Sequence, residues 1–346
     1  MKWLMAKAIR LAQEGKPAPN PKVGAVIYKD GRIIGTGYHR KAGYPHAEVI
    51  AIRAGGSACS GATLITNLEP CCHYGRTPPC TDQIIQAGIK RVVIGMIDPN
   101  PLVTGKGVAR LKEAGIGVEV GVEEEACERL NRGYIKRLET GLPYTIVKIA
   151  SSLDGRIATL EGESRWITSH EARRYVHLLR SKVDAVVVGI GTVLSDDPRL
   201  TVRHLPGENP ARIIVDPKLR IPDQASVLDG SAPTYILSQS SGKKQNGEVI
   251  TLTDFHPESI LRRIGELGFN EIMVEGGGRI FSSIIESNLF DELIIIYSGK
   301  IIGSGIPFAR FKIASLEEAL RVEIVEVRQI GPDLLLRGIN VHRNHR

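Results

Sequence analysis

The sequence predicts an α/β protein of two domains, and three observations carry this prediction. The chain has 346 residues, enough for two domains of ordinary size. Short apolar runs typical of strands alternate along it with segments whose apolar residues recur every three or four positions, as in helices. The breaker cluster Gly141-Leu142-Pro143 follows a long helical segment. We therefore expect one domain over residues 1–143 and another over residues 144–346.

The elements of the first domain begin with a helix, because apolar residues between Leu4 and Ala12 have helical spacing. Two apolar strands then flank the turn at Asp30-Gly31, which predicts an antiparallel hairpin of strands 23–28 and 33–38. The same criteria predict helix 46–54, strand 62–66, helix 82–87, strand 91–96, helix 108–114, strand 118–122 and helix 123–139. Strands that alternate with helices favour a layered α/β domain.

The second domain repeats this alternation. We expect strand 144–150, helix 172–180, strands 185–189, 212–215 and 234–237, helix 260–267, strand 271–274, helix 281–286 and strand 293–297. Segments 321–328 and 334–337 at the end of the chain predict a terminal hairpin.

Composition and charge narrow the class of protein. The 45 Lys and Arg residues against 38 Asp and Glu give a net charge of +7, which suits phosphorylated small molecules as well as nucleic acid. Aromatic residues make up only 5% of the chain, which argues against a base-stacking surface. No apolar run approaches the ~20 residues of a membrane span, and the N-terminus lacks the apolar region of a signal peptide. Five cysteines, three of them within ten residues, indicate metal-binding thiolates and a cytoplasmic location.

A zinc constellation lies in the first domain. The motif H-A-E at 46–48 opens a predicted helix, and P-C at 70–71 follows it with a further cysteine at position 80. A hydrolytic zinc deaminase needs one His and two Cys ligands, an open position for water, and a carboxylate that moves protons without binding the metal. We expect His46, Cys71 and Cys80 to bind Zn²⁺ and Glu48 to move the proton, since Glu48 shares the first helical turn with His46.

Two alternatives remain open at this point. Cys72 adjoins Cys71 and would replace it as a ligand if its side chain pointed toward the metal. His73 would close a purely structural site as a fourth ligand, but that arrangement leaves a buried Glu48 without a role, which is costly. The ordered joint pattern favours catalytic zinc.

Glycine-rich segments in the second domain suggest a cofactor site. Gly189-Ile190-Gly191 follows a strand, but Leu194 occupies the third glycine position of a dinucleotide fingerprint, and Asp196-Asp197-Pro198 follows where a helix should run. We therefore reject that motif. The triplet at 276–278 is better placed, because it opens a predicted helix whose free N–H groups suit a phosphate.

The whole chain resembles the bifunctional deaminase-reductase family of riboflavin biosynthesis. The resemblance rests on P-N-P-K-V-G at 19–24, G-Y-H at 37–39, H-A-E at 46–48, the long cysteine segment 69–80 and D-P-N-P at 98–101. In the second half it rests on segments 147–156, 164–168, 189–198, 200–203 and 274–281. It implies an N-terminal cytidine-deaminase-like α/β/α layered domain and a C-terminal dihydrofolate-reductase-like α/β domain.

The resemblance also implies two reactions with zinc and NADPH as cofactors. In the first, the 2-amino group of 2,5-diamino-6-(5-phosphoribosylamino)pyrimidin-4-one is hydrolysed. The pyrimidine would be held by Asn20, His39, Asp98 and Asn100, and the ribose phosphate by His73 and Arg76. In the second, NADPH reduces the opened ribosyl group to a ribityl chain.

Residues of the reductase site follow from the same resemblance. NADPH would lie near Ala150, Trp166, Thr192, Asp196, Gly277, Gly278, Arg279, Ile280 and Phe281. The substrate would contact Ser164, Arg180, Leu200, Arg203 and Glu275. Lys148, Asp196 and Glu275 are the polar candidates for assisting ring opening and protonation, and the sequence leaves open which of them is the acid. Taken singly, Trp166 suits a core residue, Arg180 a helix-terminal charge and Asp196 a turn cap.

Two rival functions are a nucleic-acid base deaminase with an accessory domain and a non-catalytic protein with structural zinc. Neither explains the long cysteine segment together with the second domain. We expect a small phosphorylated pyrimidine as substrate and neither nucleic acid nor membrane as partner. The family resemblance further suggests a homo-oligomer.

Overall fold

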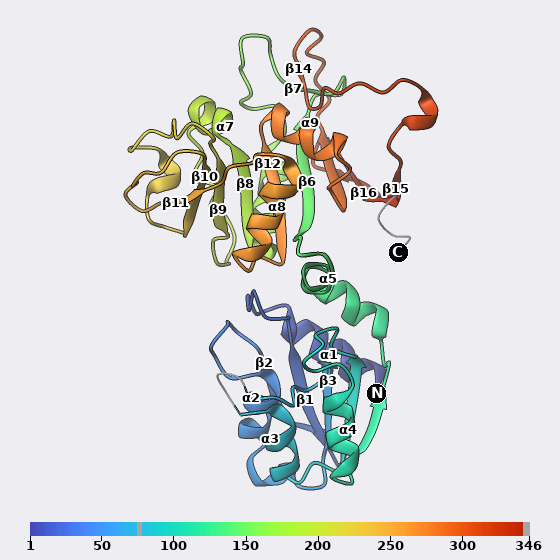
Figure 1. The fold of residues 1–346 in the computed structure, drawn as a ribbon. Helices are drawn as coiled ribbons and strands as arrows, with labels where there is room; N and C mark the ends of the chain where they lie inside the picture. Colours follow the sequence, from blue (N-terminus) through green and yellow to red (C-terminus); the bar gives the residue numbers. More distant parts are fainter. Residues whose placement is uncertain (75–77, 342–346) are drawn as a thin grey trace. The chain divides into compact units, whose positions relative to one another are not determined.

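The computed structural model describes residues 1–74 and 78–341. The chain divides into two compact units, Met1–Gly141 and Leu142–Arg346, each with its own sheet and core (Figure 1). No helix in the described part of the chain is long and apolar enough to cross a membrane.

The first unit is a five-stranded sheet covered by helices on both faces. Its elements are α1 (Lys2–Ala12), β1 (Gly24–Lys29), β2 (Arg32–Tyr38), α2 (Ala47–Gly55), β3 (Thr63–Leu68), α3 (Cys80–Gln86), β4 (Arg91–Met96), α4 (Lys106–Glu113), β5 (Gly117–Val120) and α5 (Glu124–Thr140). The strand order is β2-β1-β3-β4-β5, antiparallel from β2 to β3 and parallel from β3 to β5.

Contacts between the elements show which helices of the first unit pack together on the sheet. Helices α1 and α5 contact each other and pack on β3, while α2 contacts β1, β2 and α3, and α3 contacts α4. Together they bury one continuous apolar core drawn from β1, β3 and β4. This α/β/α layering is the one expected from the sequence, and the hairpin of β1 and β2 forms as predicted.

Close packing of α2 on β2 sets the position of the candidate zinc site. A Cβ at Gly35 would lie 2.3 Å from the Ala51 carbonyl oxygen, and one at Gly37 would lie 2.3 Å from that of Ala47. Only glycine lets the helix backbone approach this near. The N-terminus of α2, with His46 as its N-cap residue, is thereby fixed against the sheet.

The second unit is built on a nine-stranded sheet. Its elements are β6 (Tyr144–Ser151), β7 (Arg156–Ala158), α6 (His170–Lys182), β8 (Ala185–Gly189), α7 (Ile190–Asp196), β9 (Ala211–Val215), β10 (Thr234–Ser238), β11 (Glu248–Thr251), α8 (Pro257–Glu266), β12 (Glu271–Gly276), α9 (Gly278–Glu286), β13 (Glu292–Tyr297), β14 (Ile306–Pro307), β15 (Val322–Ile330) and β16 (Asp333–Asn340).

The strand order is β11-β10-β9-β8-β12-β6-β13-β16-β15. The strands from β11 to β13 in this order are parallel to one another. The terminal hairpin of β15 and β16 forms as the sequence predicts, and β16 pairs antiparallel with β13. One apolar core lies under α8 and α9, and a second lies under α6 and α7. Coverage on both faces explains why the central strands are almost continuously apolar.

One short helix of this unit was not among the elements expected from the sequence. The dinucleotide fingerprint after β8 was rejected partly because of Asp196-Asp197-Pro198, and no helix was expected there, yet α7 runs over Ile190–Asp196. The helix is only two turns long and ends where Asp197 adopts a left-handed conformation at φ 40°. Pro198 therefore lies beyond the helix, where it does not disrupt it. Strands β7, β11 and β14 were not anticipated from the sequence.

Candidate functional site

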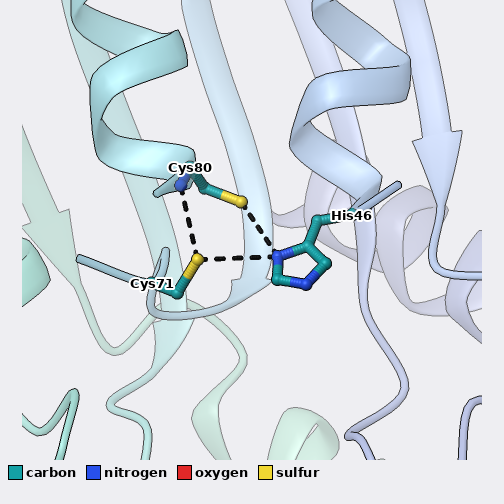
Figure 2. A group of neighbouring side chains, drawn as sticks. All are labelled: His46, Cys71 and Cys80. Carbon is teal, nitrogen blue, oxygen red and sulfur yellow. Dashed lines mark hydrogen bonds between the residues drawn. The ribbon is translucent and has the colours of Figure 1, made fainter. Parts of the chain in front are cut away.

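Three metal-ligand side chains converge in the first unit (Figure 2). His46 precedes α2, Cys71 lies in the segment after β3, and Cys80 is the first residue of α3. His46 Nδ1 lies 3.1 Å from Cys80 Sγ and 3.5 Å from Cys71 Sγ. The Cys80 backbone N–H also donates to Cys71 Sγ across 3.3 Å, which fixes the second cysteine relative to the first.

The donor set fits a zinc ion. Two thiolates and an imidazole are typical zinc ligands, and in a tetrahedral site such sulfur and nitrogen atoms lie roughly 3.5 Å apart. The observed separations of 3.1 and 3.5 Å agree with this geometry. Three protein ligands leave a fourth position free, where bound zinc supplies Lewis-acid activation of water.

The thiols of the cluster differ in their protonation. Hydrogen bonds from Cys80 and His46 outweigh burial and lower the pKa of Cys71 to about 4. The hydrogen bond to Cys71 and burial raise the pKa of Cys80. Cys72, the alternative ligand, lies outside the cluster, and its Sγ contacts the Leu102 carbonyl oxygen at 4.0 Å.

Glu48 is buried beside this cluster, with 3% of its surface exposed. Its Oε2 lies 3.6 Å from Cys80 Sγ. Burial raises the pKa of Glu48, against the opposing effect of the nearby His46. A carboxyl group with a raised pKa that is close to the ligands can both accept and release a proton near neutral pH.

The residues expected to hold the pyrimidine form two groups of contacts, one of Asn20 and His39 and one of Asp98 and Asn100. The Asn20 amide nitrogen lies 3.0 Å from His39 Nε2, and the His39 and His46 rings are 5.1 Å apart. Asp98 Oδ1 accepts the Asn100 backbone N–H and the Tyr134 hydroxyl. Burial raises the pKa of Asp98. These contacts order polar groups of the kind that a pyrimidine edge requires.

Sequence reasoning missed Glu69, which fixes the loop that carries Asp98 and Asn100. Its buried carboxylate accepts backbone N–H groups from Asp98 at 3.3 Å, Gly105 at 3.0 Å and Val108 at 3.1 Å. One side chain thereby anchors the loop after β4 and the start of α4. The available signal was its place between the end of a strand and the first ligand cysteine.

Two residues, His73 and Arg76, were expected to bind the ribose phosphate. His73 is exposed, and Arg76 lies outside the described residues.

A buried network of charged side chains occupies the second unit. Arg180, from α6, forms a two-pronged ion pair with Glu275 of β12, at 2.6 Å from Nε and 2.7 Å from Nη2. Burial opposes ionisation of Glu275, but Arg180 and Lys148 outweigh it and lower its pKa. Burial also lowers the pKa of Lys148, on β6, while Glu275 favours its charged form.

The segment after α7 joins this network. The Thr201 carbonyl oxygen accepts Arg180 Nη1 at 3.1 Å, and Arg203 Nη1 donates to the Thr201 hydroxyl at 3.1 Å. Leu200 is buried and has φ 54°. Four of the expected residues (Lys148, Arg180, Arg203 and Glu275) therefore interact directly or electrostatically, and Leu200 borders them.

Asp196 belongs to a separate contact. Its Oδ1 accepts the Ser164 hydroxyl at 2.9 Å, and its backbone carbonyl accepts an Arg165 guanidinium N–H. Trp166 is 60% exposed, so it is not a core residue, and the Arg173 guanidinium lies 4.4 Å from its ring centroid. The structure thus pairs Asp196 with Ser164 but records no contact from Asp196 to Lys148 or Glu275 among the described residues.

The glycine triplet lies between β12 and α9. Gly277 has φ 95°, and a Cβ at Gly276 would lie 2.7 Å from the Thr192 hydroxyl oxygen. Thr192 and the triplet are therefore adjacent. Gly278 and Arg279 open α9, whereas the Ile280 and Phe281 side chains are buried in the apolar core, which leaves only their backbone for a ligand. Ala150, near the end of β6, is partly buried.

Comparison with known proteins covers both units. Residues 1–96 match the family described as cytidine and deoxycytidylate deaminase zinc-binding region, and residues 143–336 match the RibD C-terminal domain. The riboflavin biosynthesis protein RibD of Aquifex aeolicus is 45% identical over 96% of each chain, and that of Escherichia coli is 40% identical over 96% of this chain and 98% of the other.

Solved structures agree over the full length. The deaminase/reductase of Thermotoga maritima superposes with a TM-score of 0.90 at 39% identity, covering 98% of each chain. RibD of Acinetobacter baumannii gives a TM-score of 0.90 at 37% identity, also with 98% of each chain covered.

Fold and site together define a bifunctional enzyme, a zinc deaminase joined to a reductase. The chain belongs to the RibD family of riboflavin biosynthesis. The expected fold class, enzyme class and pair of cofactors, zinc and NADPH, are those of this family. Neither rival function accounts for a match that extends over both domains.

Proposed function

We propose that the first domain removes the 2-amino group of 2,5-diamino-6-(5-phosphoribosylamino)pyrimidin-4-one. The observation that carries this proposal is the buried Glu48 carboxyl beside the cluster of His46, Cys71 and Cys80. Glu48 would take a proton from the attacking water and deliver it to the leaving amine. Asn20, His39, Asp98 and Asn100 would orient the ring, with His73 and Arg76 directed to the ribose phosphate.

We infer that the second domain then reduces the deaminated product with NADPH. Arg180 and Arg203 would bind the phosphorylated chain, because guanidinium groups pair well with phosphate. Lys148 and Glu275 lie in one buried network and are the preferred groups for ring opening and protonation. Ser164, Leu200, Ala150, Trp166, Thr192, Asp196 and residues 277–281 would complete the substrate and cofactor contacts. Hydride transfer itself is the chemistry of the cofactor.

The test follows both reactions in one preparation. The zinc-loaded protein is incubated with the diaminopyrimidine ribosyl phosphate, and ammonia release and absorbance at 340 nm are recorded with and without NADPH. We expect ammonia in both cases and NADPH oxidation only after ammonia appears. If bound zinc is stoichiometric and no ammonia is released, the substrate assignment is wrong.

We also infer that the chain associates with a second copy through its second domain. Strand β15 ends the nine-stranded sheet and exposes the apolar side chains of Ile324, Val325 and Val327. An edge strand with exposed apolar residues is a common place for association. Light scattering should give a dimer or larger assembly that Val327→Lys weakens, and a monomeric wild-type protein would contradict the inference.

A cytoplasmic location is part of the same proposal. All five cysteines lie within the described residues and none of them forms a disulfide, which suits a reducing compartment.

A further inference from the structure

His177 is a buried histidine that the proposed reaction does not use. It lies on α6, one turn before Arg180, with 5% of its surface exposed. Buried histidines pair their ring nitrogens with specific partners, so these partners indicate what the side chain does.

The partners of His177 belong to the segment that carries Arg203. His177 Nδ1 lies 3.0 Å from the Thr201 carbonyl oxygen and 3.2 Å from the Arg203 backbone nitrogen. With a proton on Nδ1 the ring donates to the Thr201 carbonyl, and without it the ring accepts the Arg203 N–H. Either neutral tautomer therefore holds the same segment.

The Thr201 carbonyl also accepts Arg180 Nη1 at 3.1 Å, so His177 and Arg180 hold one carbonyl oxygen from one helix. Arg180 is in turn fixed by its ion pair with Glu275. The two guanidinium groups proposed to bind the phosphorylated substrate are thus connected through one residue, Thr201, which accepts Arg180 at its carbonyl and Arg203 at its hydroxyl.

Two further hydrogen bonds of the segment lie within loops. The Val202 N–H donates to Asn209 Oδ1 at 2.9 Å, and the Arg203 guanidinium donates to the Thr201 hydroxyl. Both bonds join loop residues, whereas His177 and Arg180 tie the segment to helix α6, and His177 also contacts the Arg203 backbone nitrogen. A contact with a regular element gives a more accurate position than a contact within a loop.

We infer that His177 is a positioning residue of the reductase site, which holds the Thr201–Arg203 backbone so that the Arg203 guanidinium meets the phosphorylated substrate beside Arg180. This inference rests on the proposed reductase function. It assigns His177 no contact with the substrate or with NADPH.

Electrostatics are consistent with this role. Burial and the neighbouring Arg180 and Arg203 lower the pKa of His177 to about 4. The ring is therefore neutral at neutral pH, and it holds the segment without adding a third positive charge between two guanidinium groups.

The test compares three substitutions of His177 in the full-length, zinc-loaded protein. Asn places an amide atom at the position of Nδ1, Gln places it farther out, and Leu removes the polar atom. The control is Leu178→Asn, on the exposed face of the same helix. For each protein, kcat and KM are measured for the deaminated ribosyl phosphate and for NADPH, with ammonia release from the first domain as an internal standard.

We expect His177→Gln and His177→Leu to raise KM for the ribosyl phosphate about tenfold, which is the effect of one lost buried hydrogen bond. Their kcat and their KM for NADPH should stay near those of the wild type, and His177→Asn should restore most of the substrate KM. Unchanged substrate KM in the Gln and Leu variants would overturn the inference. An equal loss of kcat and of NADPH binding in all three variants would also overturn it, because that pattern indicates a merely structural role.

The proposed function can fail separately. If the wild-type protein and the Leu178→Asn control do not oxidise NADPH with the deaminated substrate, the reductase assignment fails. If both proteins are active, the results for the His177 variants test only the positioning role of His177.

Discussion

Glu48 Oε2 lies 3.6 Å from Cys80 Sγ, so the carboxyl group proposed to move the proton contacts one of the expected zinc ligands. The two residues are 32 positions apart and come from the first turns of α2 and α3. Because Glu48 belongs to α2 and Cys80 to α3, proton transfer by Glu48 depends on how these two helices are positioned relative to each other. Separate substitutions of ligand, proton carrier and packing should therefore give distinguishable results.

Replacing Cys80 with Ser should remove the metal. A hydroxyl is a poor zinc ligand. Replacing a residue that only hydrogen-bonds to a zinc ligand lowers zinc affinity by ~10–100-fold, so replacing the ligand itself should lower it by more. Ammonia release should disappear, while reduction of the deaminated substrate persists because that site lies in the other unit. Metal analysis after dialysis checks this, with Cys72→Ser as the matched control that retains zinc. Zinc retention in the Cys80 variant would contradict the ligand assignment.

Replacing Gly35 with Ala should weaken the first unit by about 1–3 kcal/mol, the usual cost of overpacking. The new Cβ would lie 2.3 Å from the Ala51 carbonyl oxygen and would push α2 away from β2. Thermal unfolding and zinc content measure the effect. Gly117→Ala is the control, because a Cβ at Gly117 would lie 3.8 Å from its nearest neighbour, the Lys90 carbonyl oxygen. Equal stability of the two variants would show that α2 tolerates the shift.

Replacing Glu275 with Gln should destabilise the second unit by about 3–5 kcal/mol, since it leaves Arg180 as a buried cation without its partner. Both side chains of this ion pair are almost fully buried. Urea denaturation of the second unit gives the free energy of unfolding. The exposed pair of Arg262 and Glu258 provides the comparison, and Glu258→Gln should cost less than about 1 kcal/mol. A similar cost for both would contradict the account.

The stability of the second unit should fall as the pH drops from about 6.5 to about 4. The folded-state pKa of His177 is lowered to about 4 from the ordinary 6.5. Between these values the unfolded state binds more protons, so the free energy of unfolding decreases with decreasing pH and levels off below the folded-state pKa. The urea midpoint for loss of reductase activity, recorded from pH 7.5 to pH 5, tests this. His177→Asn should flatten the dependence, and an unchanged slope would contradict it.

Local sequence patterns predicted most helices and strands and the zinc motif, whereas hydrogen bonds between residues far apart in the sequence did not follow from these patterns. The hairpin of β1 and β2 and the motif around His46 and Cys71 are signalled within a few neighbouring residues. His177 and Thr201 are 24 positions apart, and Glu69 bonds residues up to 39 positions away. Which backbone groups such side chains satisfy depends on the folded sheet and is not encoded by spacing.

Helix α7 illustrates the limits of a local rule. The elements expected from the sequence include no helix directly after β8, yet α7 forms there, and Asp197 ends it in a left-handed conformation that places Pro198 outside it. The side chains of Ile280 and Phe281 give a similar lesson. Both fall in a segment matched to the cofactor, but their amphipathic helix turns them into the core.

The most direct test of the account is NADPH oxidation at 340 nm by the Glu48→Gln variant, measured with two substrates. The variant should retain zinc, since Glu48 is not a ligand. With the diaminopyrimidine ribosyl phosphate we expect NADPH oxidation to fall by a factor of about 10²–10⁴, the contribution of a general acid–base group. With the already deaminated compound we expect the wild-type rate. Wild-type oxidation from the diamino compound would contradict the role of Glu48, and loss of oxidation with both compounds would contradict the separation of the two reactions between the two domains.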